Sequence, residues 1–564
     1  MLGEFIHRSP HYAWMVPIVY VVFFGLAALV IAVIAKYRPR WTRTDATVFV
    51  LAIPAVLVVL FPYLFQRLHW IAFLLLVIGI AAAAARRAAA APPDFGQLLR
   101  RTTPWLAAAV VLFGFGLSAT HAIGKAGGGR AASTLQRGPN VLLIILDTVR
   151  AANLSLYGYA RSTTPWLDRL AARSVVFDQA LSPAPWTLPS HASIFTGLLP
   201  HQLSADWLVP LDEAEPTLAE FFSERGYRTG GFVANLIYAT YETGLDRGFH
   251  TYVDHPISVA ELIRSSTLGR MIAPRRALRA LIGTDELLGR RSAATINEEF
   301  LRWIDSPSDR RFFAFLNYFD AHDPYLPPDS FYHVIAGADR PGRLSPLRRT
   351  TPGQRRDGMD PDDLRLEINS YDASILYIDA QIAALFEALE DRRLLDNTLV
   401  IVTSDHGEEF GEHGAYLHGH TLYMPALHVP LLIFYPPGVP QGVRVEHSVG
   451  LTDLASTIAE LTFDTAASFP GNSMARYWES STYGSRGPVR SEVTQGVRLP
   501  QWYPAANGDM VSLVENGIHY IWTSGGGEEL YDLEMDPGER ANLADSPDAM
   551  HLLQPFRRAR AHDR

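Results

Sequence analysis

The first quarter of the chain is dominated by long apolar runs separated by short basic loops. The runs cover residues 14–35, 46–65, 68–85 and 105–123. A membrane-spanning helix needs about 20 consecutive apolar residues, so three runs are long enough and the one at 68–85 is short. Helices of a soluble core normally keep a polar face, and these runs show none. The pattern therefore predicts a transmembrane region of about four helices within residues 1–123.

The cations that flank these runs predict an orientation, because lysine and arginine favour the cytoplasmic side. The loops after the first and third runs carry Lys36, Arg38, Arg40, Arg43, Arg86, Arg87, Arg100 and Arg101. The N-terminal tail and the second loop carry Arg8 and Arg67, and the segment after the fourth run carries Lys125, Arg130 and Arg137, a weaker opposing signal. On balance we expect a multi-pass protein of the plasma (inner) membrane, with both termini and the large following domain outside the cytoplasm.

A linker rich in glycine, alanine and serine, at residues 124–138, separates the predicted transmembrane region from the rest of the chain, where the apolar pattern changes. From Pro139 onward, short apolar runs alternate with amphipathic helical segments, which is typical of an α/β domain with a mainly parallel sheet. The run "NVLLIIL" is continuously apolar, as expected of a strand buried on both faces.

Several of these predicted strands end in polar residues. Asp147, the pair Asp405 and His406, His322 and Asn235 each follow an apolar run. Parallel α/β sheets bind ligands beyond the carboxyl ends of their strands, so we expect these side chains to gather at one edge. Each alone has a structural alternative, such as a helix cap or a hydrogen-bonded surface group. Together, carboxylates and a neutral imidazole predict a site for one divalent metal ion.

Thr187, in "SPAPWTLPSHASIFTG", lies at the predicted start of a helix. Threonine is a favoured N-cap residue, so a purely structural role is one interpretation. The other is that a metal ion and the positive helix end stabilise the threonine alkoxide, which makes Thr187 a nucleophile. The nearby predicted metal ligands favour the second interpretation.

Composition excludes several classes of protein. The chain of 564 residues has a net charge of −9, which argues against a nucleic-acid partner. It has no cysteine, which excludes disulfides and thiolate nucleophiles. Lysine occurs only at Lys36 and Lys125, so arginine supplies nearly every cation.

From Pro139 to Leu543 the chain resembles the sulfatase-like branch of the alkaline-phosphatase superfamily. The motifs that carry the resemblance are "NVLLIILDTVR", "WTLPSHASIFTGLLPHQ", "TLAEFFSERGYRTGGFV", "HDPYLPP", "SDHGEEFGEHG", "HGHTLYMPALHVPLLI" and "ELYDLEMDPGERANLA". The resemblance implies an α/β catalytic domain at 139–485, a mainly parallel sheet flanked by helices, and a smaller C-terminal α+β subdomain at 486–564.

The resemblance also implies roles for individual residues. The implied metal ligands are Asp147, Thr187, Asp405 and His406, with Thr187 as the nucleophile. His322 and His418 would contact the substrate or protonate the leaving group, and we expect one to be the acid. Asn235, His191 and His420 are expected to contact the substrate, although His418 or His420 bracing its loop is an open alternative.

The sequence departs from true sulfatases at the nucleophile and at the metal. Sulfatases make a formylglycine from cysteine or serine in a C/S-x-P-S-R motif, and here the motif runs from Thr187 to His191. The lysines that hold sulfate in the family are missing, and Asn235 stands in the matching stretch. Thr148 replaces a second carboxylate after Asp147. Fewer carboxylates and an added imidazole favour Mn²⁺ or Zn²⁺, with Ca²⁺ possible.

Three functions are compatible with this pattern. The first is a membrane-anchored hydrolase or transferase that moves a phosphoester group through a covalent threonine intermediate. The second is a sulfuric ester hydrolase with an unorthodox threonine nucleophile, and the third is a non-catalytic membrane binding protein. The expected partners are a phosphoester- or sulfoester-bearing lipid, glycan or small molecule. Arginine-rich stretches at 269–291 and 340–356 add membrane lipids as partners, or are only solvated segments.

The predicted topology can be tested by fusing a reporter after Arg564. A reporter that is active only outside the cytoplasm should be active, because the loop charges place the C-terminus there. A signal confined to the cytoplasm would contradict this orientation.

Overall fold

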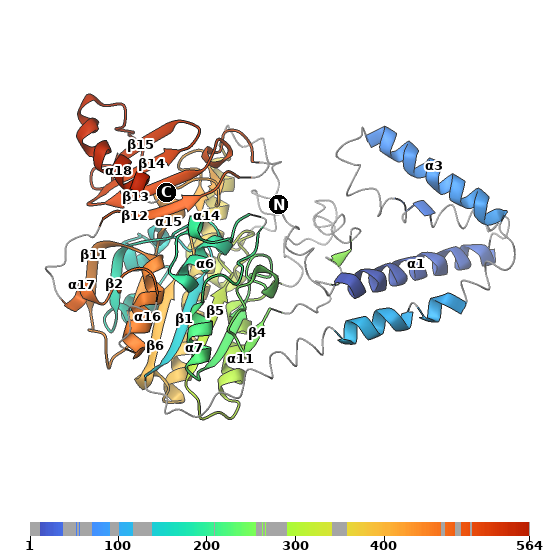
Figure 1. Cartoon of the computed structure of the whole chain (residues 1–564), viewed down its shortest axis with the longest axis horizontal. Coiled ribbons are helices and arrows are strands. Elements are labelled where there is room, and N and C mark those ends of the chain that lie inside the picture. The colour runs from blue at the N-terminus through green and yellow to red at the C-terminus, as the bar shows by residue number, and fades with distance from the viewer. Residues whose placement is uncertain are drawn as a thin grey trace. The chain divides into compact units, whose positions relative to one another are not determined.

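The computed structural model describes the chain in segments, and it divides into two units. The described residues are 12–37, 52, 53, 56, 70–90, 101–105, 107–116, 138–207, 209–254, 262, 265, 266, 290–340, 358–463, 469–479, 487–496 and 499–562. One unit comprises Met1–Phe5, Gly128–Asp254 and Gly283–Arg564, and the other comprises Ile6–Gly127 and His255–Ile282. Figure 1 shows the described elements and labels many of them.

The smaller unit contains the helices α1 (Tyr12–Tyr37) and α3 (Trp70–Ala89), and residues 101–105 and 107–116 are also helical. These helical segments coincide with the first, third and fourth apolar runs of the sequence. The second run, at 46–65, lies almost wholly outside the described residues. Helix α3 ends with Arg86 and Arg87 in its last turn. Among the helices that the structure describes, none combines the length and the apolar character required to cross a membrane. The four predicted spans are therefore not supported.

The larger unit is built on a nine-stranded sheet with the order β11-β2-β10-β6-β1-β5-β3-β4, and β9 pairs with β2. The strands are β1 (Asn140–Leu146), β2 (Val175–Leu181), β3 (Arg228–Val233), β4 (Thr251–Val253), β5 (Phe312–Tyr318), β6 (Thr398–Thr403), β9 (His428–Val429), β10 (Leu431–Phe434) and β11 (Val443–Gly450). The strands β6, β1, β5, β3 and β4 are parallel, while β10 runs antiparallel to both of its neighbours. The predicted α/β fold with a mainly parallel sheet is confirmed.

Alternation along β1 assigns its side chains to two cores. Val141, Leu143 and Ile145 pack into one hydrophobic cluster, which also contains residues of α6 (Thr187–Thr196), α7 (Leu218–Glu224) and α16 (Leu454–Phe463). Leu142, Ile144 and Leu146 pack into the other, with α5 (Pro165–Ala171), α11 (Ala293–Ile304) and α14 (Pro361–Asp391). Every residue of β1 is buried, as predicted for a strand covered by helices on both faces.

A second sheet begins at Val489, close to the predicted subdomain boundary. It is antiparallel and four-stranded, with β12 (Val489–Val493), β13 (Met510–Glu515), β14 (Ile518–Thr523) and β15 (Gly527–Asp532). Helix α18 (Met550–His562) packs on it through Leu553 and Phe556. The two sheets contact each other along β11 and β12 and belong to one compact unit. This contact brings C-terminal residues close to the loops that follow the large sheet.

Candidate active site and metal centre

Two carboxylates lie at the ends of the two central parallel strands. Asp147 directly follows β1, and Asp405 and His406 follow the neighbouring strand β6. All three side chains are fully buried. One ligand atom from each lies within 4.8 Å of the others. The sequence prediction that these strand ends meet is confirmed by this geometry.

One carboxylate oxygen of Asp147 and one of Asp405 are available to bind a cation. Asp147 Oδ1 and Asp405 Oδ2 are buried, and neither has a hydrogen-bond partner. Burial raises the pKa of Asp147 to about 6. The pKa of Asp405 is also raised, first by burial and then by the charge of Asp147. Two adjacent buried carboxylates without a counter-charge are costly, and a divalent cation would remove that cost.

The imidazole of His406 presents its unprotonated nitrogen to the same place. Its Nδ1 lies 2.9 Å from the Gly407 carbonyl, which can only accept, so Nδ1 carries the proton. Nε2 therefore keeps its lone pair, and it lies 3.3 Å from Asp405 Oδ2 and 3.4 Å from Thr187 Oγ1. Burial lowers the pKa of His406 well below its usual value, with a further contribution from His418. A neutral imidazole and two carboxylates form a suitable ligand set for a divalent metal ion.

Thr187 does not cap the helix that it begins. Helix α6 starts at Thr187, and the N-cap position is taken by Trp186 in an extended conformation, with no side-chain capping bond. The Thr187 hydroxyl instead lies 3.4 Å from His406 Nε2 and 3.4 Å from Asn235 Nδ2. The interpretation of Thr187 as only a helix cap is therefore wrong. Its oxygen lies at the positive end of a helix and beside the candidate metal ligands.

Asn235 is locked with its amide nitrogen toward the centre. Its Oδ1 accepts from the backbone N–H groups of Ile237 and Tyr238, at 3.1 and 3.0 Å. Its Nδ2 consequently faces Asp147 Oδ2, to which it donates at 2.9 Å, and Thr187 Oγ1. Asn235 is therefore in place to donate to an oxygen bound beside Thr187, and that role remains a prediction.

Asn317 belongs to the same cluster, although the sequence analysis did not select it. Its Nδ2 donates to Asp147 Oδ2 at 3.2 Å, and its Oδ1 accepts from the backbone N–H of Asn235 at 2.9 Å. It is a single polar residue in the otherwise apolar run of β5, which was the available signal. Asn317 therefore fixes Asp147 and Asn235 relative to each other.

Thr148 occupies the position of the missing second carboxylate, and its side-chain hydroxyl donates to backbone carbonyls. Its hydroxyl lies 2.7 Å from the Asp147 carbonyl and 2.9 Å from the Ala321 carbonyl. Its backbone N–H donates to Asp405 Oδ1 at 3.3 Å, and its φ is 65°. Thr148 therefore supports a ligand through its backbone amide.

His418 and His322 lie next to His406. The ring of His418 is 4.5 Å from that of His406 and 4.9 Å from that of His322. Nδ1 of His418 donates to Glu408 Oε1 at 2.9 Å, and Glu408 also accepts from the Tyr325 hydroxyl. Burial lowers the pKa of His418, but the Glu408 carboxylate outweighs burial and raises it above the usual value. The geometry keeps both histidines as candidates for the acid, and Glu408 is a partner that the sequence analysis did not assign.

His191 lies beside a candidate metal ligand, with its Nδ1 3.5 Å from Asp405 Oδ2, whereas His420 packs against the C-terminal part. His191 is fully buried in α6, where its Nδ1 donates to the Thr187 carbonyl at 2.8 Å and its ring packs on Phe315. Burial lowers the pKa of His191 to about 4. The ring of His420 packs on Tyr503, 4.4 Å away in the C-terminal part. Their predicted substrate contacts remain untested.

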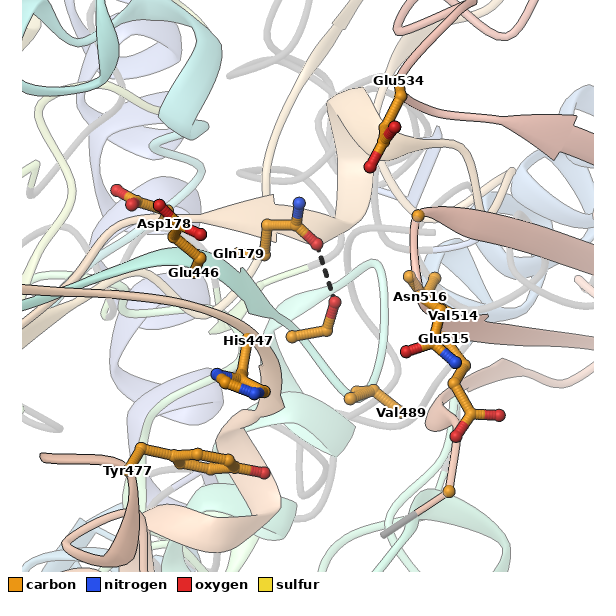
Figure 2. A pocket seen from close by; sticks show the side chains of 13 residues that line it. Asp178, Gln179, Glu446, His447, Tyr477, Val489, Val514, Glu515, Asn516 and Glu534 are labelled. Atoms are coloured by element: carbon orange, nitrogen blue, oxygen red, sulfur yellow. Dashed lines mark hydrogen bonds between the residues drawn. The ribbon is translucent and has the colours of Figure 1, made fainter. Parts of the chain in front are cut away.

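A separate cavity of about 410 Å³ lies between the large sheet and the second sheet (Figure 2). Its wall includes Asp178 of β2, Glu446 and His447 of β11, and Glu515 of β13. Asp178 is held in an ion pair by Arg444. None of the predicted site residues lines this cavity, so it is distinct from the candidate metal centre.

A comparison with protein families matches residues 139–465 to the family described as Sulfatase. This segment is more than half of the chain and carries every predicted site residue. The chain belongs to the sulfatase family. The sequence analysis predicted a hydrolase or transferase that acts on ester bonds, and the family match confirms such an enzyme and supports the hydrolase class.

Individual sulfatase-family proteins resemble the chain over much of its length. It is 25% identical to the Delta 4,5-hexuronate-2-O-sulfatase of Bacteroides thetaiotaomicron over 76% of this chain and 89% of the relative. It is 29% identical to human iduronate 2-sulfatase, over 53% of this chain and 60% of that protein. The solved structure of the phosphonate monoester hydrolase of Agrobacterium radiobacter has the same fold, with a TM-score of 0.59 and 22% identity, covering 75% of this chain and 95% of that one.

Replacing either of two ligands should weaken metal binding. We expect Asp405→Asn and His406→Ala each to lower the affinity for a divalent cation by at least about 10- to 100-fold, a loss seen even for residues that only support a ligand. Elemental analysis of the purified protein measures this directly. Added Mn²⁺ or Zn²⁺ should restore activity better than Ca²⁺.

Asp320→Asn is the matched control for this experiment. Asp320 is also a buried carboxylate after a strand, but it accepts from the backbone N–H of Ala293 and contacts none of the candidate ligands. Its variant should keep the metal content of the wild type. Unchanged metal content in the Asp405 and His406 variants, or a strict requirement for Ca²⁺, would contradict the ligand assignment.

Proposed function

We propose that the chain hydrolyses an ester of sulfuric acid, with Thr187 as the nucleophile at one divalent metal ion. The observation that carries this proposal is the position of Thr187 Oγ1, 3.4 Å from both His406 Nε2 and Asn235 Nδ2. The curated relatives named above are sulfatases. They favour this function over the phosphoester transfer that the sequence analysis placed first.

Different residues of the site would have different roles in such a reaction. Asp147, Asp405 and His406 would hold the metal ion, which when bound lowers the pKa of a coordinated hydroxyl and neutralises charge on the ester oxygens. The Thr187 hydroxyl releases its proton to water, and its oxygen attacks sulfur in line with the leaving alcohol while the bond from sulfur to that alcohol breaks. The leaving oxygen takes its proton from His418 or His322. Water then displaces sulfate from Thr187, which regains its hydroxyl proton.

The charge of the site favours a substrate with a single negative charge. No lysine occurs after Lys125. Arg150 is paired with Glu412 at 2.6 Å, and Arg290 donates to the Asp320 carbonyl at 2.8 Å. Among the described residues, His418 lies next to His406, and the Glu408 carboxylate raises its pKa and so favours its charged form. A bound metal ion would add positive charge there, and two carboxylates oppose it. A sulfate ester carries one charge, whereas a phosphate monoester carries about −1.5 to −2 at pH 7.

A second candidate, hydrolysis of a phosphodiester or a phosphonate monoester, also satisfies this charge argument. The observation that favours it is Thr187 itself, because the formylglycine of true sulfatases derives from cysteine or serine. Such esters suit an unmodified hydroxyl nucleophile and a phospho-threonine intermediate. The similarity of fold to a phosphonate monoester hydrolase is compatible with this candidate.

We also propose that the catalytic unit works outside the cytoplasm, where the loop charges of the N-terminal segment place it. This proposal depends on the sequence pattern alone. The reporter fused after Arg564 tests it independently of the chemistry.

Thr187→Ala should abolish turnover without unfolding the protein. Removing the nucleophile is expected to lower kcat by at least about 10³-fold, while the helix loses no capping bond. Turnover of nitrophenyl sulfate and of bis(nitrophenyl) phosphate at equal concentration measures the effect. The same assay on the wild type separates the two candidate functions.

Thr187→Ser is the matched control, because it keeps the hydroxyl and removes only a methyl group. It should retain measurable turnover and the metal content of the wild type. Full activity of Thr187→Ala on both esters would end the assignment of Thr187 as the nucleophile.

The acid can be identified from its dependence on the leaving group. Substituting the acid, His418 or His322, by alanine should slow esters of poor leaving groups far more than nitrophenyl esters, because only an alkoxide of high basicity needs a proton as it departs. Substituting the other histidine, which would help Asn235 to hold the non-bridging oxygens, should slow both alike. Equal losses across leaving groups in both variants would remove the acid role from each.

A further inference from the structure

The segment that carries His418 has an unusual backbone. Leu417 has a φ of 69° and Gly419 has a φ of 84°, so His418 lies between two residues in left-handed conformations. Leucine rarely adopts this conformation, which persists only where surrounding contacts enforce it. The bond from His418 to Glu408 holds the ring but not the backbone on either side. The antiparallel pairing of β8 (Tyr416–Leu417) with β7 (Glu409–Phe410) holds the backbone before His418, so other contacts must fix the rest of the segment.

Glu539, from the C-terminal part of the chain, contacts the segment before and after His418. Its backbone carbonyl accepts from Nε2 of His413 at 3.2 Å. Its Oε2 accepts from the backbone N–H of Met424 at 2.8 Å, where α15 (Met424–Leu427) begins. Glu539 is 1% exposed and has a φ of 53°. A buried glutamate in a left-handed conformation therefore joins two points of the loop that lie eleven positions apart.

Two further contacts connect the same segment to the C-terminal part. The hydroxyl of Tyr423 donates to Oε2 of Glu529 in β15, at 2.9 Å. The backbone N–H of Ala505 donates to the carbonyl of His420 at 3.0 Å. The C-terminal part thus holds residues 413–424 from several sides, and Glu539 is the residue that makes two of these bonds.

The carboxylate of Glu539 is itself held in place by a buried row of polar side chains. Nδ1 of His519 donates to Glu539 Oε1, and Nε2 of His519 lies 2.7 Å from the hydroxyl of Ser512. This hydroxyl–imidazole–carboxylate order resembles a hydrolytic triad, but Ser512 and His519 are fully buried. No substrate could reach the hydroxyl without unfolding this part of the chain. The row therefore orients Glu539 toward Met424.

We propose that Glu539 is a positioning residue for the reaction, which sets the place of His418 through its bonds to His413 and Met424. The inference rests on the proposed function, in which His418 contacts the reacting ester. Under this inference, the C-terminal subdomain supports catalysis by holding the loop of His418, without contacting the substrate. The bond to His413 is made by the backbone carbonyl and survives a side-chain substitution, whereas the bond to Met424 is made by the carboxylate. Displacing a catalytic group by about 1 Å can cost about 100-fold in rate, so loss of the carboxylate bond to Met424 should be measurable.

Glu539→Ala tests the inference, with Glu539→Gln as the conservative variant. The alanine variant should lower kcat by about 10- to 100-fold, change KM by less than about twofold, and show the same dependence on the leaving group as His418→Ala. The glutamine variant should recover most of kcat, because its carbonyl can accept from Met424. Its amide can donate to His519, which then donates through Nε2 to Ser512.

Hydrogen exchange provides a readout that needs no turnover. Amides at 413–424 should exchange faster in Glu539→Ala than in the wild type, whereas amides in β1 and β6 should not. Glu492→Ala is the control, because Glu492 is also a buried glutamate of the second sheet, bound to His201 and Arg490 rather than to the loop. It should change neither the exchange of 413–424 nor kcat.

Two results would overturn the inference. The first is that amides at 413–424 exchange at the wild-type rate in Glu539→Ala. The second is that the double variant Glu539→Ala/His418→Ala loses kcat by the product of the two single losses. Residues that act through one another should instead give a double variant no slower than His418→Ala alone. Failure of the proposed function is distinguishable, because it appears as an active Thr187→Ala enzyme and leaves the exchange result unaffected.

Discussion

The site depends on the repulsion between two buried carboxylates, Asp147 and Asp405, at the ends of neighbouring parallel strands. The strand pairing fixes their separation, so neither can turn away to reach water. One oxygen of each has no hydrogen-bond donor, and the nearby imidazole of His406 is neutral. A divalent cation bound between the two carboxylates would remove this repulsion.

The same constraint supports the proposal that the ordinary hydroxyl of Thr187 acts as the nucleophile. Helix α6 begins at Thr187, so its oxygen lies beside the metal ligands and at the positive end of the helix. Asn235, which follows β3, and Asn317, which lies in β5, both donate to Asp147 Oδ2 and hold that carboxylate in place. The chemistry thus comes from loops, but the sheet determines where those loops meet.

Much of this arrangement could be predicted from the sequence, because strand ends of a parallel sheet converge. Asp147, Asp405 and Asn235 each follow an apolar run, and they meet as expected. Asn317 was missed because its side chain lies within a strand, and Glu408 because it is one acid in a run of several polar residues. The role of a distant residue such as Glu539 depends on tertiary contacts between two sheets, which no local pattern reports. The apolar N-terminal runs indicated spanning helices that the described part of the structure does not support.

The most direct test of the account is to identify the group that the ester leaves on the enzyme. The wild type is mixed with excess aryl sulfate or aryl phosphodiester, quenched in acid during turnover and digested, and the peptides are mapped by mass spectrometry. The account predicts a covalent adduct on Thr187 that disappears when the substrate is exhausted. An adduct on another residue, or turnover with no adduct on Thr187 under conditions where the second step is slow, would contradict it.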